Sequence, residues 1–220
     1  LHPASTSSIA EAGLFLHSEW NSEVAPDLQF YFGPNLFVPP GYPHFDWAIG
    51  SAVSLTHLQN IGSVSLRSSD AKDAPMFQMN YLQSEVDAQK LVFAIRLMRQ
   101  LLHTSFLDEF RGAEIAPGAE IQSDEAIEAY IRNNCGTVWH PVGTCKMGTD
   151  PAAVVDPELR VHGVEGLRVV DASIMPTITT GNTNAPTIMI GEKAADLIRA
   201  EHTQSNPNRL NVQKLTYLSI

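Results

Sequence analysis

The sequence is poor in cysteine, in basic residues and in long apolar runs. Cys135 and Cys145 are its only cysteines. Two are too few for a disulfide framework and their spacing fits no metal site, so we predict no metal and favour a reduced compartment such as the cytoplasm. The 14 basic residues against 24 acidic ones argue against nucleic acid as a partner, because phosphate binding needs a concentrated basic face. No apolar run is long enough to cross a bilayer as a helix, so no membrane span is predicted.

The remaining composition is that of a folded protein. Hydrophobic residues make up 44% of the 220 residues and charged residues 17%, an ordinary globular balance that can form a core. The chain starts at Leu1, and its first stretch, "LHPASTSSIAEAG", resembles the interior of a protein. We therefore expect a fragment or a processed chain.

Alternating apolar and polar residues predict strands in the first third of the chain. Residues 27–32, "DLQFYF", alternate and are followed by Gly33 and Pro34, which favour a turn. Two further strands are predicted at 50–57 and 62–67. The short Asn-Ile-Gly connection between them predicts a hairpin.

Two capped helices are predicted next. The first runs from Glu85 to His103, with Ser84 as N-cap and Asp87 in the capping-box position. Its apolar residues recur at steps of three and four, which predicts one buried face. They are Leu91, Ile95, Met98 and Leu102, widened by Phe93, Leu97 and Leu101. The second helix begins after Ser123 in "SDEAIEAYIRNN".

A short buried strand and a last helix are predicted in the final third. "RVVDAS" is apolar up to Asp171, as a buried parallel strand is at the carboxyl edge where ligands of α/β sheets bind. After a loop, Pro186 opens a helix that runs to Ala200. Its inward face comprises Ile190, Ala194, Leu197 and Ile198. Residues 201–220 are a terminal extension, and the whole pattern predicts an α+β fold.

Two polar stretches are candidates for chemistry. In "VWHP", the proline Pro141 excludes helical backbone at His140, so the stretch is predicted to be extended; His140 is either a base or a histidine that holds a loop. Asn182 and Asn184 lie in the turn before the last helix, whose first N–H groups favour an anion, and both either bind a ligand or only shape the turn. Cys145 has no identifiable orienting group, and we predict a buried thiol.

Three long motifs, in this order, resemble one family. "GTVWHPVGTCKMG", "VVDPELRVHGVEGLRVVDASIMP" and "GNTNAPTIMIGEKAADLI" are similar to the C-terminal portion of glucose–methanol–choline (GMC) flavin oxidoreductases. Choline and other alcohol dehydrogenases are the most alike, because they too carry asparagine rather than a second histidine in the last motif. The resemblance implies a substrate-binding domain, an antiparallel sheet with flanking helices, over 1–135. It implies the catalytic segment and the C-terminal part of an α/β FAD-binding domain, with its last strand and helix, over 136–200, and then the extension 201–220.

The resemblance also implies roles for individual residues. His140 matches the family's base on the alcohol hydroxyl, and Asn184 matches the partner that hydrogen-bonds the substrate oxygen. The implied reaction is oxidation of an alcohol to an aldehyde, with hydride transfer to FAD. The implied cofactor contacts are Trp139, Asp171, Ala172, Asn182, Ala185, Pro186 and Thr187.

The family's FAD-binding fingerprint, G-x-G-x-x-G, is absent from this sequence. We therefore expect these residues alone to bind FAD weakly and turn over little, with a missing N-terminal FAD-binding segment as a partner. The other implied partners are a small alcohol and an electron acceptor, oxygen or a quinone-like molecule. The aromatic loop 36–46, with Phe37, Tyr42 and Phe45, is expected to shape the alcohol's pocket. Two alternatives stay open, a hydroxynitrile lyase of the same family and a non-catalytic binding fragment.

Overall fold

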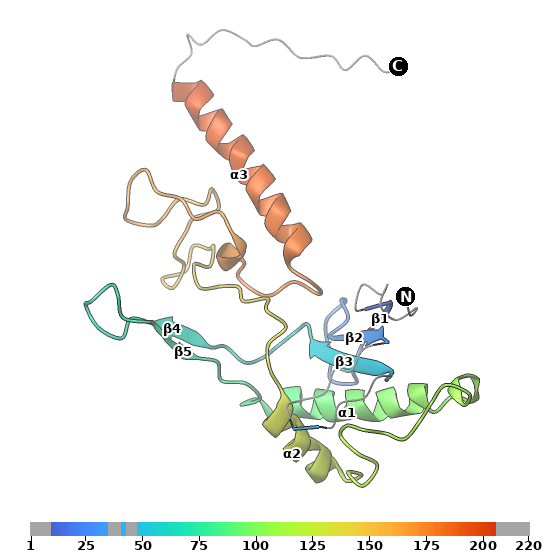
Figure 1. Ribbon diagram of the computed structural model, residues 1–220. Helices are drawn as coiled ribbons and strands as arrows, with labels where there is room; N and C mark the ends of the chain where they lie inside the picture. Colours follow the sequence, from blue (N-terminus) through green and yellow to red (C-terminus); the bar gives the residue numbers. More distant parts are fainter. Residues whose placement is uncertain (1–9, 35–40, 43–47, 206–220) are drawn as a thin grey trace, which may run out of the picture. The chain divides into compact units, whose positions relative to one another are not determined.

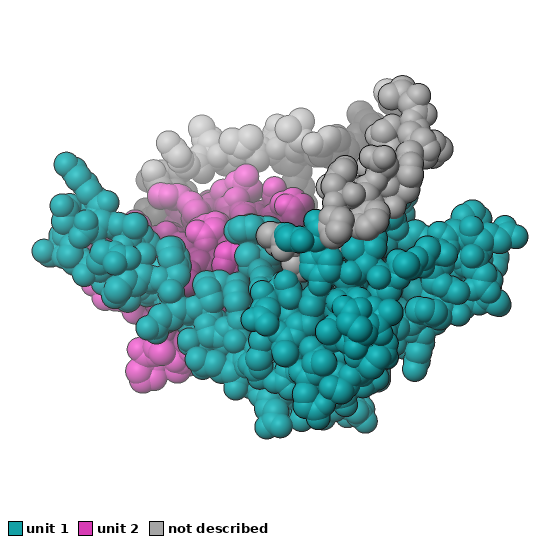
Figure 2. All heavy atoms as spheres, turned by 60° about the horizontal axis from the view of Figure 1, so that its bottom comes forward, with its two compact units in different colours: residues 1–140, 178–182 teal, residues 141–177, 183–220 magenta. Residues whose placement is uncertain are grey.

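The computed structural model describes residues 10–34, 41–42 and 48–205. The chain divides into two compact units (Figure 2). Unit 1 comprises residues 1–140 and 178–182, and unit 2 comprises residues 141–177 and 183–220. The chain therefore leaves unit 1 after His140, returns to it for a short segment, and leaves it again after Asn182.

A three-stranded antiparallel sheet lies in unit 1 (Figure 1). Its strands, in the order in which they pair, are β1 (Ala12–Leu16), β2 (Leu28–Gly33) and β3 (Gly50–Leu55). Leu28 and Phe30 of the central strand are fully buried and pack against helix α1 (Glu85–Leu102). The strand predicted at 27–32 is thus confirmed, and its apolar residues form the core of unit 1.

The hairpin predicted between the second and third strands is wrong. β3 pairs with β2, and this pairing places Val53 and Leu55 beside the buried residues of β2. The later strand, β4 (Ser63–Ser65), pairs with β5 (Met76–Gln78) in a separate two-stranded sheet whose residues are all exposed. Burial against β2, rather than the short connection in sequence, decides the partner of β3.

Both predicted N-caps are confirmed. The Ser84 hydroxyl accepts a hydrogen bond from the N–H of Asp87 (3.4 Å) at the start of α1. The Ser123 hydroxyl accepts one from the N–H of Ala126 (3.2 Å) at the start of α2 (Asp124–Asn134). Each bond satisfies an N–H group that the first helical turn leaves without a partner. The two helices share a buried cluster of Leu82, Val92, Ile127 and Ile131.

The buried face of α1 differs from the predicted stripe. Its buried residues are Asp87, Ala88, Lys90, Val92 and Ala94. All seven residues of the predicted stripe are only half-buried, and four of them line a cavity, namely Leu91, Ile95, Met98 and Leu102. The two alanines have no bulky side chain, which lets the helix backbone pack closely.

A buried ion pair ties α1 to the residue before β2. Lys90 Nζ lies 2.9 Å from Asp27 Oδ2, and the two side chains are 5% and 0% exposed. Asp27 also accepts hydrogen bonds from the N–H and the hydroxyl of Ser18, both at 2.7 Å. Burial raises the pKa of Asp27, but Ser18 and Lys90 outweigh it and hold the pKa below its ordinary value. The ionised carboxylate therefore fixes where β2 begins.

Unit 2 consists of loops packed against one long helix, α3 (Asn184–Ser205; Figure 1). Its core consists of Val155, Leu159, Ile174, Met175, Ile190 and Ala194. Ile190 and Ala194 confirm the predicted inward face, and Pro186 lies in the first turn as expected. The helix starts at Asn184 and passes Ala200, so it is longer than predicted. The rest of the predicted extension, 206–220, lies outside the described residues.

The strand predicted at "RVVDAS" is not formed. Arg168 makes an isolated bridge with Arg160, and Val170 is 37% exposed. A buried parallel strand needs neighbouring strands, and the described residues of unit 2 contain none. The chain turns instead into a 3₁₀ helix, η3 (Ala172–Ile174).

Small antiparallel sheets and flanking helices confirm the predicted α+β class. Within the described ranges, no helix is both long and apolar enough to cross a membrane.

Candidate active site

His140 lies in non-helical backbone at the end of the first segment of unit 1, and its side chain is half-buried. The expectation that "VWHP" is extended throughout is wrong, because Trp139 has a φ of 63°. The N–H of Trp139 bonds to the hydroxyl of Thr137 (2.9 Å), a local turn that the residue-before-proline rule does not anticipate. A bulky residue in left-handed backbone costs about 1–3 kcal/mol and is most often found at functional sites.

Asn182 is the hydrogen-bond partner of His140. The Nδ2 atom of Asn182 lies 2.9 Å from His140 Nε2. Because an amide nitrogen only donates, this ring nitrogen must be the acceptor, and the ring proton of neutral His140 lies on Nδ1. The Oδ1 atom of Asn182 accepts a hydrogen bond from Gln29 Nε2, also at 2.9 Å. His140 thus presents an unprotonated nitrogen, the state that a general base needs.

The short segment 178–182 is tied to the sheet region of unit 1. Thr180 Oγ1 lies 3.0 Å from His57 Nε2, just beyond β3. Gly181 has a φ of 125°, which side chains rarely adopt, and a Cβ there would lie 3.7 Å from the Phe15 ring. These contacts hold the backbone that carries Asn182.

Asn184 belongs to unit 2, where it is the first residue of α3 rather than part of the preceding turn. The N–H of Thr187 bonds to the carbonyl of Thr183 (3.0 Å), and Pro186 has no N–H. The N–H groups of Asn184 and Ala185 therefore lie at the positive end of the helix dipole. This end suits an electron-rich group of a cofactor or a substrate.

Asp171 and Ala172 also belong to unit 2. The Asp171 carboxylate accepts a hydrogen bond from the Ser173 N–H (2.8 Å) and caps η3. It is thereby committed to the chain itself, so a cofactor contact here would come from backbone or from Ala172. Cys145, predicted to be a buried thiol, is half-buried, and Cys135 is exposed.

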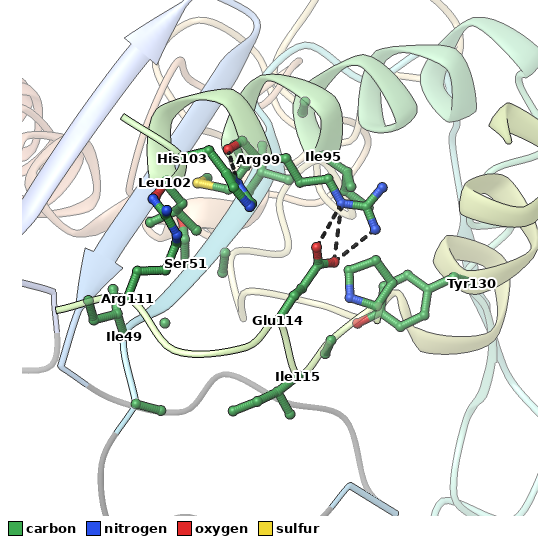
Figure 3. Close-up of a pocket in the computed structure, with 18 of the residues that line it drawn as sticks. Ile49, Ser51, Ile95, Arg99, Leu102, His103, Arg111, Glu114, Ile115 and Tyr130 are labelled. Atoms are coloured by element: carbon green, nitrogen blue, oxygen red, sulfur yellow. Dashed lines mark hydrogen bonds and ion pairs between the residues drawn. The ribbon is translucent and has the colours of Figure 1, made fainter. Parts of the chain in front are cut away.

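Unit 1 also holds a cavity of about 760 Å³ between α1, α2, β3 and the loop after α1 (Figure 3). Its wall is mainly apolar, and its charged groups are paired. Arg99 donates to Glu114 at 2.8 Å and 3.1 Å, and Arg111 donates to Asp108. Burial raises the pKa of Tyr130 to about 12, with smaller effects from Tyr42 and Glu114. These side chains stabilise the wall of the cavity, and none of them belongs to a sequence motif for which a chemical role was predicted.

Two features of unit 1 escaped sequence reasoning. Gln29 received no role from the sequence, yet it is 7% exposed and donates to Asn182. His57 and its contact with Thr180 had no signal in the sequence. Of the aromatic loop, Tyr42 is described and half-buried, whereas Phe37 and Phe45 lie outside the described residues.

Comparison with known proteins places the chain in a family. The sequence profile of the C-terminal domain of GMC oxidoreductases matches residues 59–191. An oxygen-dependent choline dehydrogenase from Escherichia coli O45:K1 is 47% identical over 200 residues, which are 87% of this chain and 34% of that protein. One from Shigella flexneri is 46% identical over 204 residues, 89% of this chain and 35% of that protein. This chain therefore spans about a third of the length of these relatives.

Solved structures show the same fold. Pyridoxine 4-oxidase from Mesorbium loti superposes with a TM-score of 0.77 at 28% identity, over 88% of this chain and 38% of that one. A fungal aryl-alcohol oxidase superposes with a TM-score of 0.68 at 34% identity, over 81% and 28%. A formate oxidase from Aspergillus oryzae, studied for its FAD modification, has a TM-score of 0.75 at 28% identity, over 82% and 33%.

The fold and the motifs are those of the C-terminal domain of a flavoenzyme family. The chain belongs to the GMC oxidoreductase family, whose members are FAD-dependent, and its relatives include choline dehydrogenases and alcohol oxidases.

Proposed function

We propose that this chain carries the catalytic base of an FAD-linked enzyme that oxidises an alcohol to an aldehyde. The observation that supports this proposal is the state of His140. Asn182 donates to its Nε2, so this nitrogen carries no proton, as a general base requires. Membership of the GMC family supplies the reaction class.

The resemblance to the family implies each proposed role, and the chemistry of the side chain fits it. His140 removes the hydroxyl proton. Asn184 donates from its amide to the substrate oxygen, and it stabilises a developing alkoxide without titrating near neutral pH. FAD, when bound, supplies the acceptor for the hydride. The start of α3, from Ala185 to Thr187, offers a dipole to the flavin, and Trp139 offers an exposed aromatic surface, 82% accessible.

The proposed substrate is a small alcohol, of the kind for which the choline dehydrogenase and aryl-alcohol oxidase relatives are named. The proposed electron acceptor is oxygen or a quinone-like molecule. We further propose that the 220 residues alone retain FAD weakly, because they contain no G-x-G-x-x-G fingerprint. A flavin that stays bound to this chain through desalting would contradict that last expectation.

The test is turnover by FAD-loaded protein that contains this chain, measured with a panel of alcohols and an artificial dye, with and without oxygen. The variant His140→Ala should lower kcat by about 10²–10⁴-fold, the usual contribution of a general base. The matched control is His103→Ala, because His103 is an exposed histidine at the end of α1. Turnover that survives His140→Ala would refute the assignment of the base.

The same preparation separates the alternatives. An alcohol oxidoreductase reduces its flavin when alcohol is added without oxygen, and the flavin absorbance bleaches. A hydroxynitrile lyase performs no net redox step and leaves the flavin oxidised. A non-catalytic fragment shows neither bleaching nor lyase activity.

A further inference from the structure

We propose that Gln29 is a positioning residue for His140 and acts through the side-chain amide of Asn182. Gln29 Nε2 donates to Asn182 Oδ1, and Asn182 Nδ2 contacts His140 Nε2, each at 2.9 Å. The three side chains come from β2, from the segment 178–182 and from the end of the first segment of unit 1. This inference rests on the proposed function, because it gives the three side chains a part in preparing the base.

The direction of the two hydrogen bonds gives Gln29 its role. A side-chain amide has one acceptor end and one donor end. Gln29 occupies the acceptor end of Asn182, so the donor end faces His140. Only an unprotonated ring nitrogen can accept from it, and Nε2 is therefore kept free of a proton. Gln29 in this way selects the tautomer of His140 without touching the ring.

Of the three hydrogen-bonded side chains, Gln29, Asn182 and His140, Gln29 has the least freedom to move. It is 7% exposed and lies in the central strand, opposite Phe15 of β1 and Ser54 of β3. Asn182, by contrast, is exposed. Pairing on both edges of the strand fixes the Gln29 backbone, and burial restricts its side chain, so Gln29 can hold the orientation of the exposed Asn182 amide.

The series also prepares the site for substrate. Before an alcohol arrives, Asn182 donates to the same lone pair that the alcohol hydroxyl must use. When the alcohol binds, its O–H replaces the Asn182 N–H at Nε2, and its proton passes to that nitrogen. The Asn182 N–H thus occupies the hydrogen-bonding position of the alcohol hydroxyl until the substrate displaces it.

The first experiment reads the tautomer of His140 by long-range ¹H–¹⁵N correlation NMR of the ¹⁵N-labelled chain, with the His140 signal assigned from the His140→Ala spectrum. In the wild type, Nε2 should be unprotonated. In Gln29→Glu the ionised carboxylate only accepts, so Asn182 must turn its donor end to position 29 and its oxygen to His140. The proton should then move to Nε2.

Asn182→Asp is the second variant, because residue 182 is exposed and the change does not threaten the fold. A carboxylate at 182 accepts from both Gln29 and His140, so Nε2 should again carry a proton. Ser54→Ala is the control, since Ser54 pairs with Gln29 across the sheet but bonds to Tyr31. In Ser54→Ala, His140 should have the same tautomer as in the wild type.

The second experiment measures turnover of the same variants in FAD-loaded protein that contains this chain. Gln29→Glu and Asn182→Asp should lower kcat at least about tenfold, a part of what a general base contributes. If the variants change the His140 tautomer but the FAD-loaded wild-type protein shows no turnover, the positioning role is supported and the proposed function is refuted. The role of Gln29 would be overturned if turnover depends on His140 but no variant changes its tautomer. It would also be overturned if Nε2 of His140 carries the proton in the wild type.

Discussion

Replacing Lys90 with methionine should destabilise unit 1 strongly. Methionine has nearly the volume of the lysine stem, so the change removes a charge and leaves no large cavity. Asp27 then keeps its two hydrogen bonds from Ser18 but loses the cation 2.9 Å away, at a site where its side chain is 0% exposed.

The expected size follows from this geometry. Removing one partner of a buried ion pair costs about 3–5 kcal/mol, because the remaining charge is neither paired nor hydrated. The Ser18 bonds compensate part of that charge, which places Lys90→Met near the lower end, at about 3 kcal/mol. The double variant Asp27→Asn, Lys90→Met contains no stranded charge and should recover at least half of the loss.

The pH dependence gives a second signature. In the wild type the pKa of Asp27 is lowered, so its contribution is fully present above the unfolded value of about 3.9 and is lost as pH falls through the folded value. In Lys90→Met, burial without the cation favours the protonated acid. The penalty of the substitution should therefore shrink as pH falls from neutral to about 5.

Urea unfolding followed by tryptophan fluorescence measures this effect. All three tryptophans, Trp20, Trp47 and Trp139, lie within residues 1–140, so the signal reports unit 1. Lys72→Met, at an exposed lysine, is the control and should stay within about 0.5 kcal/mol of the wild type. A loss below about 1 kcal/mol for Lys90→Met, or a penalty independent of pH, would show that the pair does not hold α1 to β2 as described.

Two further outcomes are expected. Gly62→Ala should disrupt the β4–β5 sheet at a cost of about 1–3 kcal/mol, because its Cβ would lie 2.5 Å from the carbonyl oxygen of Gln78. Amide hydrogen exchange at Val64 measures this, Gly112→Ala is the control with open space around it, and unchanged protection would contradict the clash. Tyr130 should resist ionisation until about pH 12, so its contribution to stability is present below its unfolded pKa of about 10 and lost as pH rises toward 12. Phenolate absorbance of wild type and Tyr130→Phe checks it, and a difference already complete near pH about 10 would contradict it.

Local rules predicted the helices well. Ser84 and Ser123 were predictable as N-caps because capping depends on residues within one turn. The partner of β3 was not predictable from its neighbours, since the buried residues of β2 select it from 20 or more positions away. The strand prediction at "RVVDAS" was wrong for a related reason, because a parallel strand forms only when neighbouring strands of its sheet are present.

In the candidate site, too, local features were predictable from the sequence and contacts between distant residues were not. His140 and Asn184 were found from their motifs, and the pairing of these two stays a prediction. Gln29 could not be assigned from the sequence, because its partner Asn182 lies 153 positions further along the chain. The left-handed backbone of Trp139 was missed since it depends on the Thr137 hydroxyl as well as on the proline that follows His140.

The distance in sequence between Gln29 and Asn182 has a consequence for how the protein is made. Closing so long a loop is entropically costly, so contacts of this kind form late, after the local helices and the sheet have gathered the chain. A newly synthesised chain contains His140 well before it contains Asn182. The histidine would therefore acquire its fixed tautomer only when the last segment of unit 1 is in place, and reactivity would mark the completion of folding.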